Sequence, residues 1–148
     1  MVKIKQGDLL KAKEDIICHQ VNVQGIMGGG IARQLANQYS DLEEEYKNFC
    51  SMHNYNYNLL KGKVFKIMIQ GKFIMNMFSQ KENFDTDYEM LKIALKEIKE
   101  FAEPLNLSIA IPYKIGCGIA NGDWNTVLSI IDEVFRDYKV TLYKLEKN

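Results

Sequence analysis

Apolar residues recur along the chain in two patterns, one with the two-residue period of strands and one with the wider spacing of helices. Residues 2–6 alternate apolar and polar side chains, which is typical of a strand with one exposed face, and residues 16–21 form the more continuous run of a buried strand. Two later runs are separated by Gln70 and Gly71 and are predicted to form a hairpin. The predicted strands cover residues 2–6, 16–21, 64–69, 73–78, 107–111 and 140–145.

Helical spacing of apolar residues marks further segments. Residues 87–102 carry apolar side chains along one face, and this helix is expected to end before Pro104, since the residue before a proline disfavours helical geometry. Residues 52–60 are polar and tyrosine-rich, and without periodicity they are predicted to be a connection. The glutamates at positions 43–45 are predicted to be the solvated face of their helix. The predicted helices cover residues 30–39, 41–50, 87–102 and 125–138.

The alternation of strands and helices predicts the fold class. Elements in this order imply a mixed sheet with helices on both faces, in which ligand sites lie beyond the carboxyl ends of the strands. A length of 148 residues is that of one domain, and 47% apolar residues are enough to bury a core. We therefore expect a single α/β domain over residues 1–148, present as a monomer.

Charge and hydropathy exclude several classes of partner. Lys plus Arg and Asp plus Glu both number 19, so the formal net charge is zero and no basic field attracts nucleic acid non-specifically. No apolar run approaches the roughly 20 residues that cross a bilayer, and the segment MVKIKQGD lacks the apolar stretch of a signal peptide. We expect a soluble, cytoplasmic protein without membrane partners.

Residue types that bind metals are few. The three cysteines, Cys18, Cys50 and Cys117, form no C-x-x-C pair, and the two histidines are His19 and His53. This spacing fits neither a zinc site nor a disulfide framework. We expect no metal and no disulfide.

Two of the strands run into glycine-rich turns that precede helices. Residues 25–30 contain four glycines, and residues 116–122 contain three. The start of a helix presents unpaired N–H groups and the positive end of the macrodipole, and glycines let a phosphate approach the main chain. Two such loops could hold a diphosphate between them. We expect Gly29 and Gly118 to lie where the backbone meets phosphate oxygens or adopts conformations denied to other residues.

The second glycine-rich turn invites two nucleotide-binding interpretations, and both fail. GCGIAN at residues 116–121 nearly matches G-x-G-x-x-G, but Asn121 replaces the third glycine and Pro112 precedes the turn. One further strand also leaves no room for the second half of a dinucleotide-binding fold. A P-loop is excluded because no Lys-Ser or Lys-Thr follows either glycine cluster.

Four segments together resemble a macrodomain: GDLL near the start, ICHQVN, QGIMGGGIA, and IPYKIGCGIANGDW near the end. Their order and spacing fit from Lys5 to Leu145, and the chain looks closest to the branch with ADP-ribose 1''-phosphate phosphatases and the terminal ADP-ribose protein glycohydrolase. The resemblance implies a three-layer α/β/α macrodomain fold with a mixed central sheet. It also implies that both glycine loops surround the diphosphate of ADP-ribose, with no metal or organic cofactor.

The resemblance further implies a set of ligand-binding residues. Asp8, with Leu9 beside it, corresponds to the residue that accepts a hydrogen bond from the adenine amino group, although an Asp after a strand also commonly caps the next turn. Asn22 corresponds to the asparagine near the distal ribose. Tyr143 and Leu145 fall where the family supports adenine, or are ordinary strand residues. The phosphate loops, which bind through main-chain N–H groups, are Gly28, Gly29, Gly30 and Ile31, and then Lys114, Ile115, Gly116, Cys117, Gly118, Ile119 and Ala120.

The catalytic residues of the glycohydrolase are not retained. Gln80 and Ala120 stand where the glycohydrolase has a lysine and an aspartate, and neither side chain can form a covalent adduct with the sugar C1''. Lys81 is one position along, and a loop could shift it inward. The alternative is that Lys81 is an exposed lysine beside Glu82.

Phosphatase-type members of the branch suggest two other catalytic candidates, His19 in HQVN and Asp123 in NGDW. A base that orients water or an acid that protonates the leaving oxygen would suffice for removing a phosphate from C1''. His19 is otherwise a satisfied, partly buried strand histidine. Asp123 is otherwise the N-terminal cap of the helix that starts near Asn125.

The resemblance leads to one expected function and one competitor. We expect the chain to bind ADP-ribose and to hydrolyse a bond at its C1'' position. The substrate would be ADP-ribose 1''-phosphate or an ADP-ribosylated macromolecule, modified on a carboxylate. The competing expectation is a reader module that binds ADP-ribose without turnover, which the missing lysine and aspartate favour.

Overall fold

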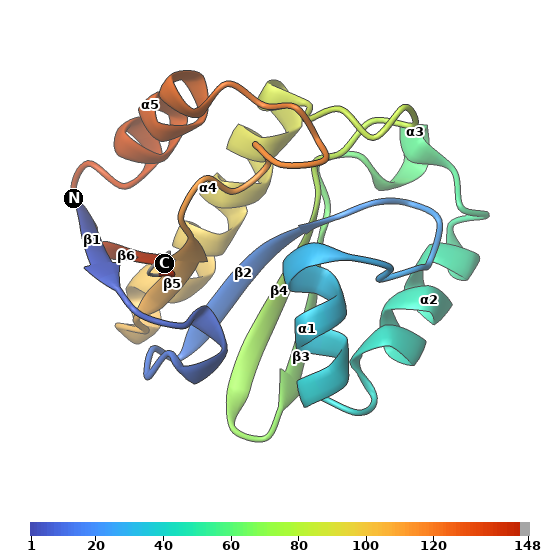
Figure 1. Cartoon of the computed structure of the whole chain (residues 1–148), viewed down its shortest axis with the longest axis horizontal. Helices are drawn as coiled ribbons and strands as arrows, with labels where there is room; N and C mark the ends of the chain where they lie inside the picture. Colours follow the sequence, from blue (N-terminus) through green and yellow to red (C-terminus); the bar gives the residue numbers. More distant parts are fainter. Residues whose placement is uncertain (146–148) are drawn as a thin grey trace.

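The computed structural model describes residues 1–145, which form a six-stranded sheet with helices on both faces (Figure 1). The strands are β1 (Val2–Gln6), β2 (Ile16–Val21), β3 (Val64–Ile69), β4 (Lys72–Phe78), β5 (Ile109–Pro112) and β6 (Val140–Lys144). Their spatial order is β1-β6-β5-β2-β4-β3, and all neighbours are parallel except the antiparallel hairpin of β3 and β4. The predicted mixed sheet of an α/β fold is confirmed.

The helices form two layers. The first and second helices pack on one face of the sheet, and the fourth and fifth pack on the other. The helices are α1 (Gly30–Gln38), α2 (Leu42–Met52), α3 (Tyr57–Leu60), α4 (Tyr88–Leu105) and α5 (Trp124–Val134), with the 3-10 turn η1 (Leu9–Lys11).

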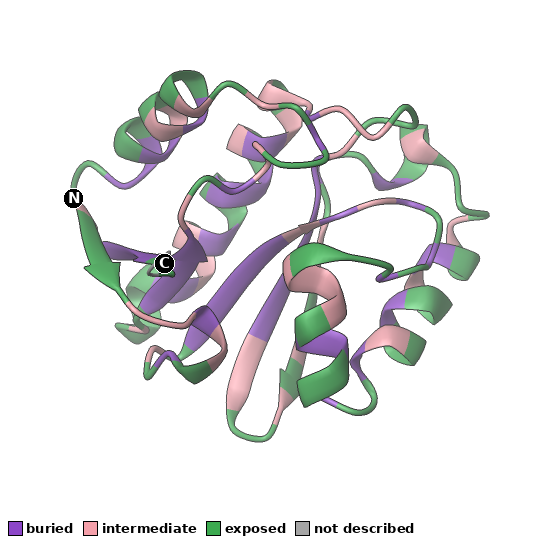
Figure 2. Cartoon of the chain, in the orientation of Figure 1, coloured by how far each residue is buried: buried purple, intermediate pink, exposed green. Residues whose placement is uncertain are grey.

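β2 lies near the centre of the sheet and is buried on both faces. Ile16 and Cys18 belong to the apolar cluster under α4 and α5, whereas Ile17 and Val21 belong to the cluster under α1 and α2. Figure 2 shows the buried colour continuing along β2 and β4. Because helices cover both faces of these strands, their sequences read as continuous apolar runs rather than as an alternation.

The parallel strands bring their carboxyl ends to one edge of the sheet. Four connections leave from this edge: residues 7–15 after β1, the first glycine loop (residues 22–29) after β2, the central loop (residues 79–87) after β4, and the second glycine loop (residues 113–123) after β5. Ligand sites of open α/β sheets lie at this edge. The two glycine loops predicted from the sequence are therefore neighbours in space, with the central loop beside them.

The prediction for residues 52–60 is wrong in one respect, because this connection contains the short helix α3. The side chain of Asn56 caps the helix by accepting a hydrogen bond from the N–H of Asn58. Leu60, at its end, is fully buried. One helical turn is too short to show a periodicity, so the sequence pattern did not indicate it.

The predicted end of α4 before Pro104 is also wrong, because the helix includes this residue in its last turn. Asn106 ends the helix in the left-handed conformation, with φ of 54°. The N–H of Leu107 then reaches back to the carbonyl of Ala102 at 3.0 Å. A proline in the last turn removes a single N–H bond, and this cap gives the carbonyls of Ala102 and Glu103 hydrogen-bond partners.

α5 is shorter than the predicted helix at residues 125–138. Phe135 is fully buried and the Tyr138 hydroxyl donates a hydrogen bond to the carbonyl of Leu107, although neither residue is helical. These two residues lie in a turn, but their apolar side chains continue the helical spacing. The predicted helix was therefore too long. Leu145 follows the last strand instead of ending it.

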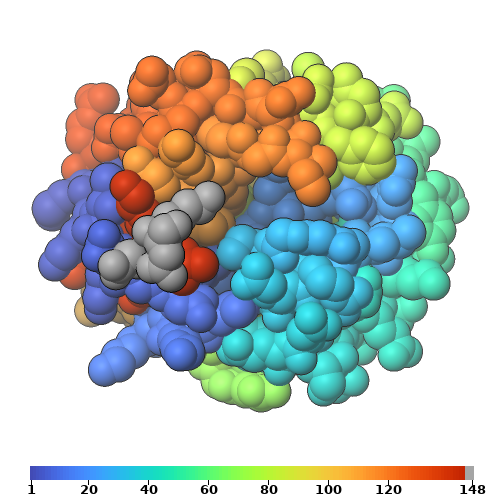
Figure 3. Space-filling view, in the orientation of Figure 1, coloured from blue at the N-terminus to red at the C-terminus, as the bar shows by residue number. Residues whose placement is uncertain are grey.

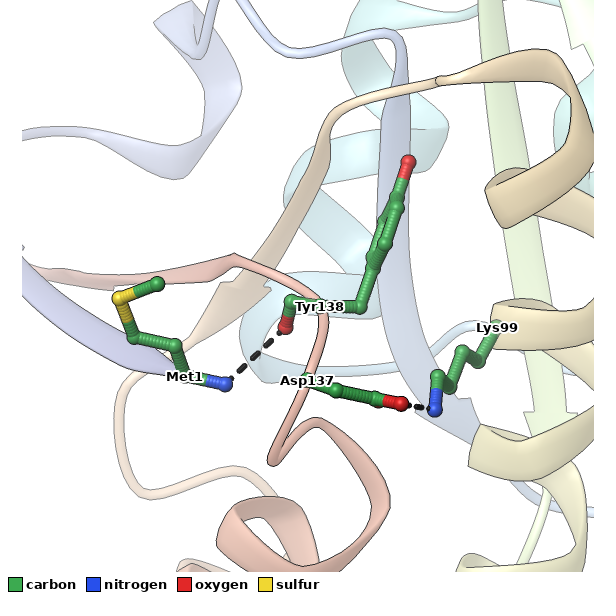
Figure 4. Close-up of polar contacts among 4 residues, drawn as sticks. All are labelled: Met1, Lys99, Asp137 and Tyr138. Carbon is green, nitrogen blue, oxygen red and sulfur yellow. Dashed lines mark hydrogen bonds and ion pairs between the residues drawn. The ribbon is translucent and has the colours of Figure 1, made fainter.

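Two polar contacts outside the sheet hydrogen bonds fix the segment before β6, one to the start of the chain beside β1 and one to α4 (Figure 4). The amino group of Met1 donates a hydrogen bond to the carbonyl oxygen of Tyr138 at 3.1 Å. Lys99 of α4 pairs with Asp137 in the connection between α5 and β6. Exposed ion pairs of this kind stabilise little, so this pair mainly orients the connection over α4.

Two further properties concern the whole described chain. Between residues 1 and 145, no helix combines the length and the apolarity that crossing a membrane requires. The same residues contain no group of three or more His, Cys, Asp or Glu side chains that could hold a metal ion. The expectation of a function without metal stays a prediction.

Leu95 tests the inward face of α4. It is fully buried against the sheet, so Leu95→Ala is expected to lower the free energy of unfolding by ~2–5 kcal/mol through lost burial and a residual cavity. Ile93 on the same helix is 44% exposed, and Ile93→Ala is expected to cost less than about 1 kcal/mol. Urea unfolding followed by circular dichroism measures both changes, and equal losses would contradict this orientation of the helix.

Candidate functional site

Two adjoining cavities open where the three loops meet. The His19 cavity has a volume of about 350 Å³ and is lined by His19 and by both glycine loops. The Phe84 cavity has a volume of about 400 Å³ and is lined by Phe84 and by the first glycine loop. The wall that both cavities share consists of Gln20, Gly29, Ala32, Gln80 and Ile119.

The two glycine loops face each other across this groove. Figure 3 shows the orange surface of the second glycine loop opposite the light-blue surface of the first loop and α1, with the blue of β2 in the recess between them. A Cβ atom on Gly29 would lie 3.9 Å from the Cδ1 atom of Ile119, so the loops nearly touch at the shared wall. A third cavity of about 330 Å³ lies at the opposite edge of the sheet, among Glu14 and Thr141, and neither loop reaches it.

The first glycine loop ends at the start of α1. Gly29 is the N-terminal cap and makes no side-chain cap bond, and Gly30 has φ of 58°, a left-handed conformation that favours glycine. The first turn of a helix leaves N–H groups without intrahelical partners, and the macrodipole adds partial positive charge there. Gly30, Ile31 and Ala32 line the His19 cavity. This wall of the cavity is therefore suited to an anion.

Asn22 gives the first glycine loop its shape. Its Nδ2 donates to the carbonyl of Ile26 at 3.1 Å, and its Oδ1 accepts from the N–H of Gln24 at 2.9 Å. The Tyr46 hydroxyl lies 2.6 Å from the carbonyl oxygen and 2.7 Å from the Oδ1 atom of Asn22. Asn22 lines the Phe84 cavity, but both of its polar groups already hold the loop.

The prediction that residues 43–45 are a solvated face is wrong for Glu43. Its half-buried carboxylate accepts a hydrogen bond from the N–H of Met27 at 2.8 Å and pairs with Arg33 at 3.2 Å. Glu43 thereby joins α2 to the first glycine loop and to α1. Glu44 and Glu45 are exposed, as predicted.

Thr86 of the central loop holds the second glycine loop. Its hydroxyl donates to the carbonyl of Gly116 at 2.7 Å, and its N–H donates to the carbonyl of Ala120 at 2.9 Å. Gly116 has φ of 74°, and a Cβ atom there would lie 2.8 Å from the hydroxyl oxygen of Thr86. A Cβ atom on Gly122 would lie 2.4 Å from the carbonyl oxygen of Gly116. The shape of the loop itself requires these two glycines.

Of the two alternatives predicted for Gly29 and Gly118, the one of a conformation denied to other residues does not hold. Gly29 is extended, with φ of −157°, and neither residue has the left-handed conformation found at Gly30 and Gly116. A Cβ atom on Gly118 would meet no protein atom within 4 Å. Both residues line the His19 cavity, so the part of the prediction that concerns space beside the backbone remains open to test.

His19 is buried in the wall of the His19 cavity, with 1% of its surface exposed. Its Nε2 lies 2.5 Å from the Oδ1 of Asn76. The Nδ2 of Asn76 donates to the carbonyl of Phe65 at 2.9 Å, which orients Oδ1 toward the histidine. The imidazole therefore carries its proton on Nε2, and Nδ1 is a hydrogen-bond acceptor.

The environment of His19 decides what chemistry it can perform. Burial lowers its pKa to about 4, although the bond to Asn76 acts in the opposite direction, so the ring is neutral near pH 7. Nδ1 has no hydrogen-bond partner within residues 1–145. A neutral acceptor of this kind can orient a water or a hydroxyl, but it cannot protonate a leaving group.

Two carboxamides that the sequence did not single out as site residues line both cavities. The Nε2 of Gln20 donates to the hydroxyl of Ser79 at 3.1 Å and to that of Thr86 at 3.3 Å. The Nε2 of Gln80 lies 3.5 Å from the Oε1 of Gln20. Gln20 could have been identified from the sequence, because it is a polar residue within the buried run ICHQVN. Gln80 was considered only for the lysine that it replaces.

The remaining catalytic candidates lie outside both cavities. Lys81 and Asp123 are exposed and line neither of them. The Oδ2 of Asp123 accepts hydrogen bonds from the N–H of Thr126 at 3.0 Å and from its hydroxyl at 2.9 Å, so Asp123 is the N-terminal cap of α5. The catalytic roles of Lys81 and Asp123 stay predictions.

None of the residues predicted beside adenine lines either cavity: Asp8, Leu9, Tyr143 and Leu145. Asp8 caps η1 by accepting a hydrogen bond from the N–H of Leu10 at 3.0 Å. Tyr143 is buried, and its hydroxyl donates to Glu14 at 2.7 Å. Leu145 is 65% exposed. Their contacts with a ligand stay predictions.

Most residues predicted for the phosphate loops do line the cavities. Gly28 lines the Phe84 cavity. Cys117 lines neither cavity, and its thiol donates to the carbonyl of Ile115 at 3.4 Å. Burial raises the pKa of the Cys117 thiol, and the charge of Asp123 adds to the effect, so the group is not poised as a nucleophile. The second-loop residues in the His19 cavity are Lys114, Ile115, Gly116, Gly118, Ile119 and Ala120.

Known proteins share both this sequence pattern and this fold, although no family model matches the chain. The ADP-ribose glycohydrolase OARD1 of Homo sapiens is 26% identical over 144 residues, which cover 95% of this chain and 89% of the relative. The ADP-ribose 1''-phosphate phosphatase of Saccharomyces cerevisiae is 28% identical over 176 aligned positions, covering 95% and 96% of the two chains. The solved macrodomain of Mycobacterium tuberculosis DarG superposes with a TM-score of 0.83 at 25% identity, covering 100% of this chain and 99% of that one.

The arrangement of layers, the mixed sheet and these similarities define the class: the protein is a macrodomain by fold. Within that class it lies close to the branch that contains these hydrolases and DarG. The resemblance found in the four sequence segments is confirmed.

Burial of His19 makes the stability of the protein depend on pH. The pKa is about 4 in the folded chain and 6.5 in its ordinary state, so between these values only the unfolded chain binds the proton. The contribution of neutral His19 to the free energy of unfolding is fully present above pH 6.5. It is lost as the pH falls toward 4, by about 1.4 kcal/mol per pH unit and ~3 kcal/mol in all.

Urea unfolding between pH 7.5 and pH 4.5 measures this dependence, with His19→Gln as the matched variant. The parent is expected to lose more stability than the variant over this range, because the carboxylates contribute equally to both. Parallel pH profiles for the two proteins would contradict the buried neutral state.

Proposed function

We propose that this macrodomain binds ADP-ribose along the two joined cavities and hydrolyses a bond at its C1'' position. One observation carries the proposal: the N–H groups at the start of α1 and the second glycine loop form opposite walls of the His19 cavity. A diphosphate between these walls would meet backbone donors and a helix dipole from one side and a glycine-rich backbone from the other. The distal ribose would then lie toward the shared wall and the Phe84 cavity.

The relatives support hydrolysis rather than another reaction. One is named as an ADP-ribose glycohydrolase and another as an ADP-ribose 1''-phosphate phosphatase, and both names describe cleavage of a bond at the distal ribose. In this proposal the oxygen of a water attacks C1'', the bond between C1'' and the leaving group breaks, and the leaving group takes the bonding electrons. The proton that the water loses passes to the leaving group or to solvent. The Nδ1 of neutral His19 and the carboxamide of Gln80 orient the water, while the backbone donors stabilise developing charge.

A reader module remains the second candidate, and specific observations favour it. Gln80 occupies the shared wall where the glycohydrolase has a lysine, and the carboxylate of Asp123 is engaged as a helix cap. A site with backbone donors and no charged catalytic side chain could bind ADP-ribose without turnover. Incubation with ADP-ribose 1''-phosphate and with mono-ADP-ribosylated protein, followed by chromatography of the products, distinguishes the two candidates.

The setting of the activity belongs to the same proposal. A balanced charge of 19 basic and 19 acidic residues favours binding of a small ligand or of a single modified site over binding of a long polyanion. We assign the function to one macrodomain over residues 1–148, acting as a monomer in the cytoplasm. Asp8 and Tyr143 would support the adenine at the far end of the ligand.

Gly118→Val tests ADP-ribose binding. A Cβ atom on Gly118 would meet no protein atom within 4 Å, and Gly118 lines the His19 cavity, so the variant is expected to keep its melting temperature and to lose binding. The parent is expected to bind ADP-ribose with roughly micromolar affinity and to melt at a higher temperature in its presence. Isothermal titration and thermal melting measure both effects, and an unchanged affinity in the variant would remove the second glycine loop from the binding site.

Three substitutions test the catalytic assignment. His19→Ala is expected to lower the turnover number by roughly 10²–10⁴-fold, because the acceptor that orients water is lost, with a small change in ADP-ribose affinity. Lys81→Ala is expected to be nearly silent, since Lys81 lines neither cavity. Asp123→Asn keeps the helix cap, so a loss of turnover in this variant measures the catalytic role predicted for Asp123 apart from its capping role.

Lys81 could act differently, and the same experiment detects it. If Lys81→Ala stopped turnover, and borohydride trapped an adduct of protein and ADP-ribose only in the parent, hydrolysis would proceed through a covalent lysine intermediate. The role assigned to His19 would then be wrong.

A further inference from the structure

β1 is the last strand at one end of the sheet. Within residues 1–145, its single neighbouring strand is β6, and neither layer of helices covers it. Val2 packs against the apolar cluster under α4 and α5, whereas residues 3–6 are exposed. Figure 2 shows β1 largely in the colour of exposed residues, beside the buried β6. β1 therefore has two open faces and a free edge.

The backbone groups on this free edge belong to alternate residues. The N–H of Val140 donates to the carbonyl of Met1 at 3.0 Å, so Met1 turns its carbonyl toward β6. The N–H of Gly7 donates to the carbonyl of Lys144, also at 3.0 Å. In a parallel pair, the N–H and C=O of one residue point to the same side, and the side alternates along the strand. Odd-numbered residues of β1 therefore bond to β6, and even-numbered residues, with Ile4 at the centre, present their N–H and C=O groups outward.

The side chains of β1 alternate between a basic and an apolar face. Lys3 and Lys5 lie on the face that also holds Tyr143, and the Nζ of Lys5 is 5.7 Å from the centroid of the Tyr143 ring. Neither lysine belongs to an ion pair among residues 1–145. Ile4 lies on the opposite face and is 52% exposed. The edge thus combines positive charge, apolar surface and outward backbone groups.

Pairing of β1 with the β1 of a second copy is unfavourable. In an antiparallel pair centred on Ile4, Lys3 of each copy would lie opposite Lys5 of the other. Like charges directly opposite each other are destabilising, and lysines on an edge strand commonly protect it against pairing between copies. The same two charges favour a strand that carries acidic residues at alternate positions.

We propose that the edge of β1 is a docking site for an extended, acidic segment of another protein, which adds a strand to the sheet. An apolar residue of that segment lies opposite Ile4 and exchanges the central hydrogen bonds with it. The acidic residues on either side lie opposite Lys3 and Lys5. The inference goes beyond the proposed function, because β6 and β5 separate β1 from β2, whose loop forms the two cavities. A strand of five residues makes a small interface, so the expected Kd is roughly 10–1,000 µM.

The test uses the capped peptide GEVEVEG as the probe. Its matched control is GKVKVKG, which has the same apolar residues and the opposite charges. Amide hydrogen exchange, followed by NMR, measures the contact at single residues. At a GEVEVEG concentration of about ten times Kd, exchange of the Ile4 N–H is expected to slow by about 10-fold through mass action. The N–H groups of Lys3 and Lys5 already bond to β6 and are expected to change little. GKVKVKG is expected to leave all of them unchanged.

Exchanging the charges tests the role of the lysines. Lys3→Glu combined with Lys5→Glu is expected to lower the affinity for GEVEVEG by about 10-fold or more and to allow binding of GKVKVKG, because both cross-strand pairs change sign. The matched control is Lys61→Glu combined with Lys63→Glu, which makes the same change in net charge at two exposed lysines before β3. This control is expected to keep the peptide affinity of the parent.

Ile4→Pro tests the backbone contact. Proline removes the outward N–H and leaves the bonds between β1 and β6 in place, since a proline on an edge strand is tolerated where its nitrogen faces solvent. The variant is expected to keep its melting temperature and to lose binding of GEVEVEG. If the proline variant does not fold, the exchange of charges and the protection of the Ile4 N–H decide the question.

Four results would overturn the inference. GEVEVEG could fail to bind, could bind without slowing exchange at Ile4, or could bind no better than GKVKVKG. Slowed exchange at Ile4 that increases with protein concentration in the absence of peptide would show pairing between copies. Single-stranded oligothymidylate serves as a second anionic probe. If it binds more tightly than GEVEVEG and Ile4→Pro keeps that binding, the surface is a basic patch for nucleic acid, and the inference is overturned as well.

Discussion

Two hydrogen bonds from Thr86 join the connections that make up the site. The hydroxyl bonds to the carbonyl of Gly116, and the N–H bonds to the carbonyl of Ala120. Thr86 is 5% exposed, so water does not compete for these bonds. Through them the loop after β4, which carries Gln80 and Phe84, and the loop after β5 behave as one wall. The shapes of both cavities depend on this contact.

The helices and strands of this fold were largely predictable, because residues on buried faces are apolar and recur with the period of the element. β2 is covered on both faces, so its apolar run identified it with the correct bounds. The errors have physical causes. The helix α3 is a single turn without a period, and α4 continues through Pro104 because Asn106 supplies a left-handed cap. Phe135 and Tyr138 lie in a turn after α5, but they pack inward at positions that continue the spacing of the helix.

The site was predictable only in part, because its residues meet through tertiary contacts. The two glycine loops could be located from composition, and their meeting at one edge followed from parallel strands. The sequence did not indicate that Glu43 would reach back to the N–H of Met27, or that Gln20 and Gln80 would line one wall. Phe84 carries no signal either, since its place in the wall comes from a backbone angle and, among the described residues, it belongs to neither core cluster.

The pairing of β1 with β6 has a consequence for how the chain assembles. The register joins Val2 to Val140, whereas β3 and β4 form a local hairpin. Contacts between distant residues require loop closure, which costs entropy before the contacts repay it, so local pairs form early and distant pairs form late. During synthesis β1 leaves the ribosome well before its partner strand exists. The order in which this strand is made and the order in which it finds its place in the sheet are therefore opposite.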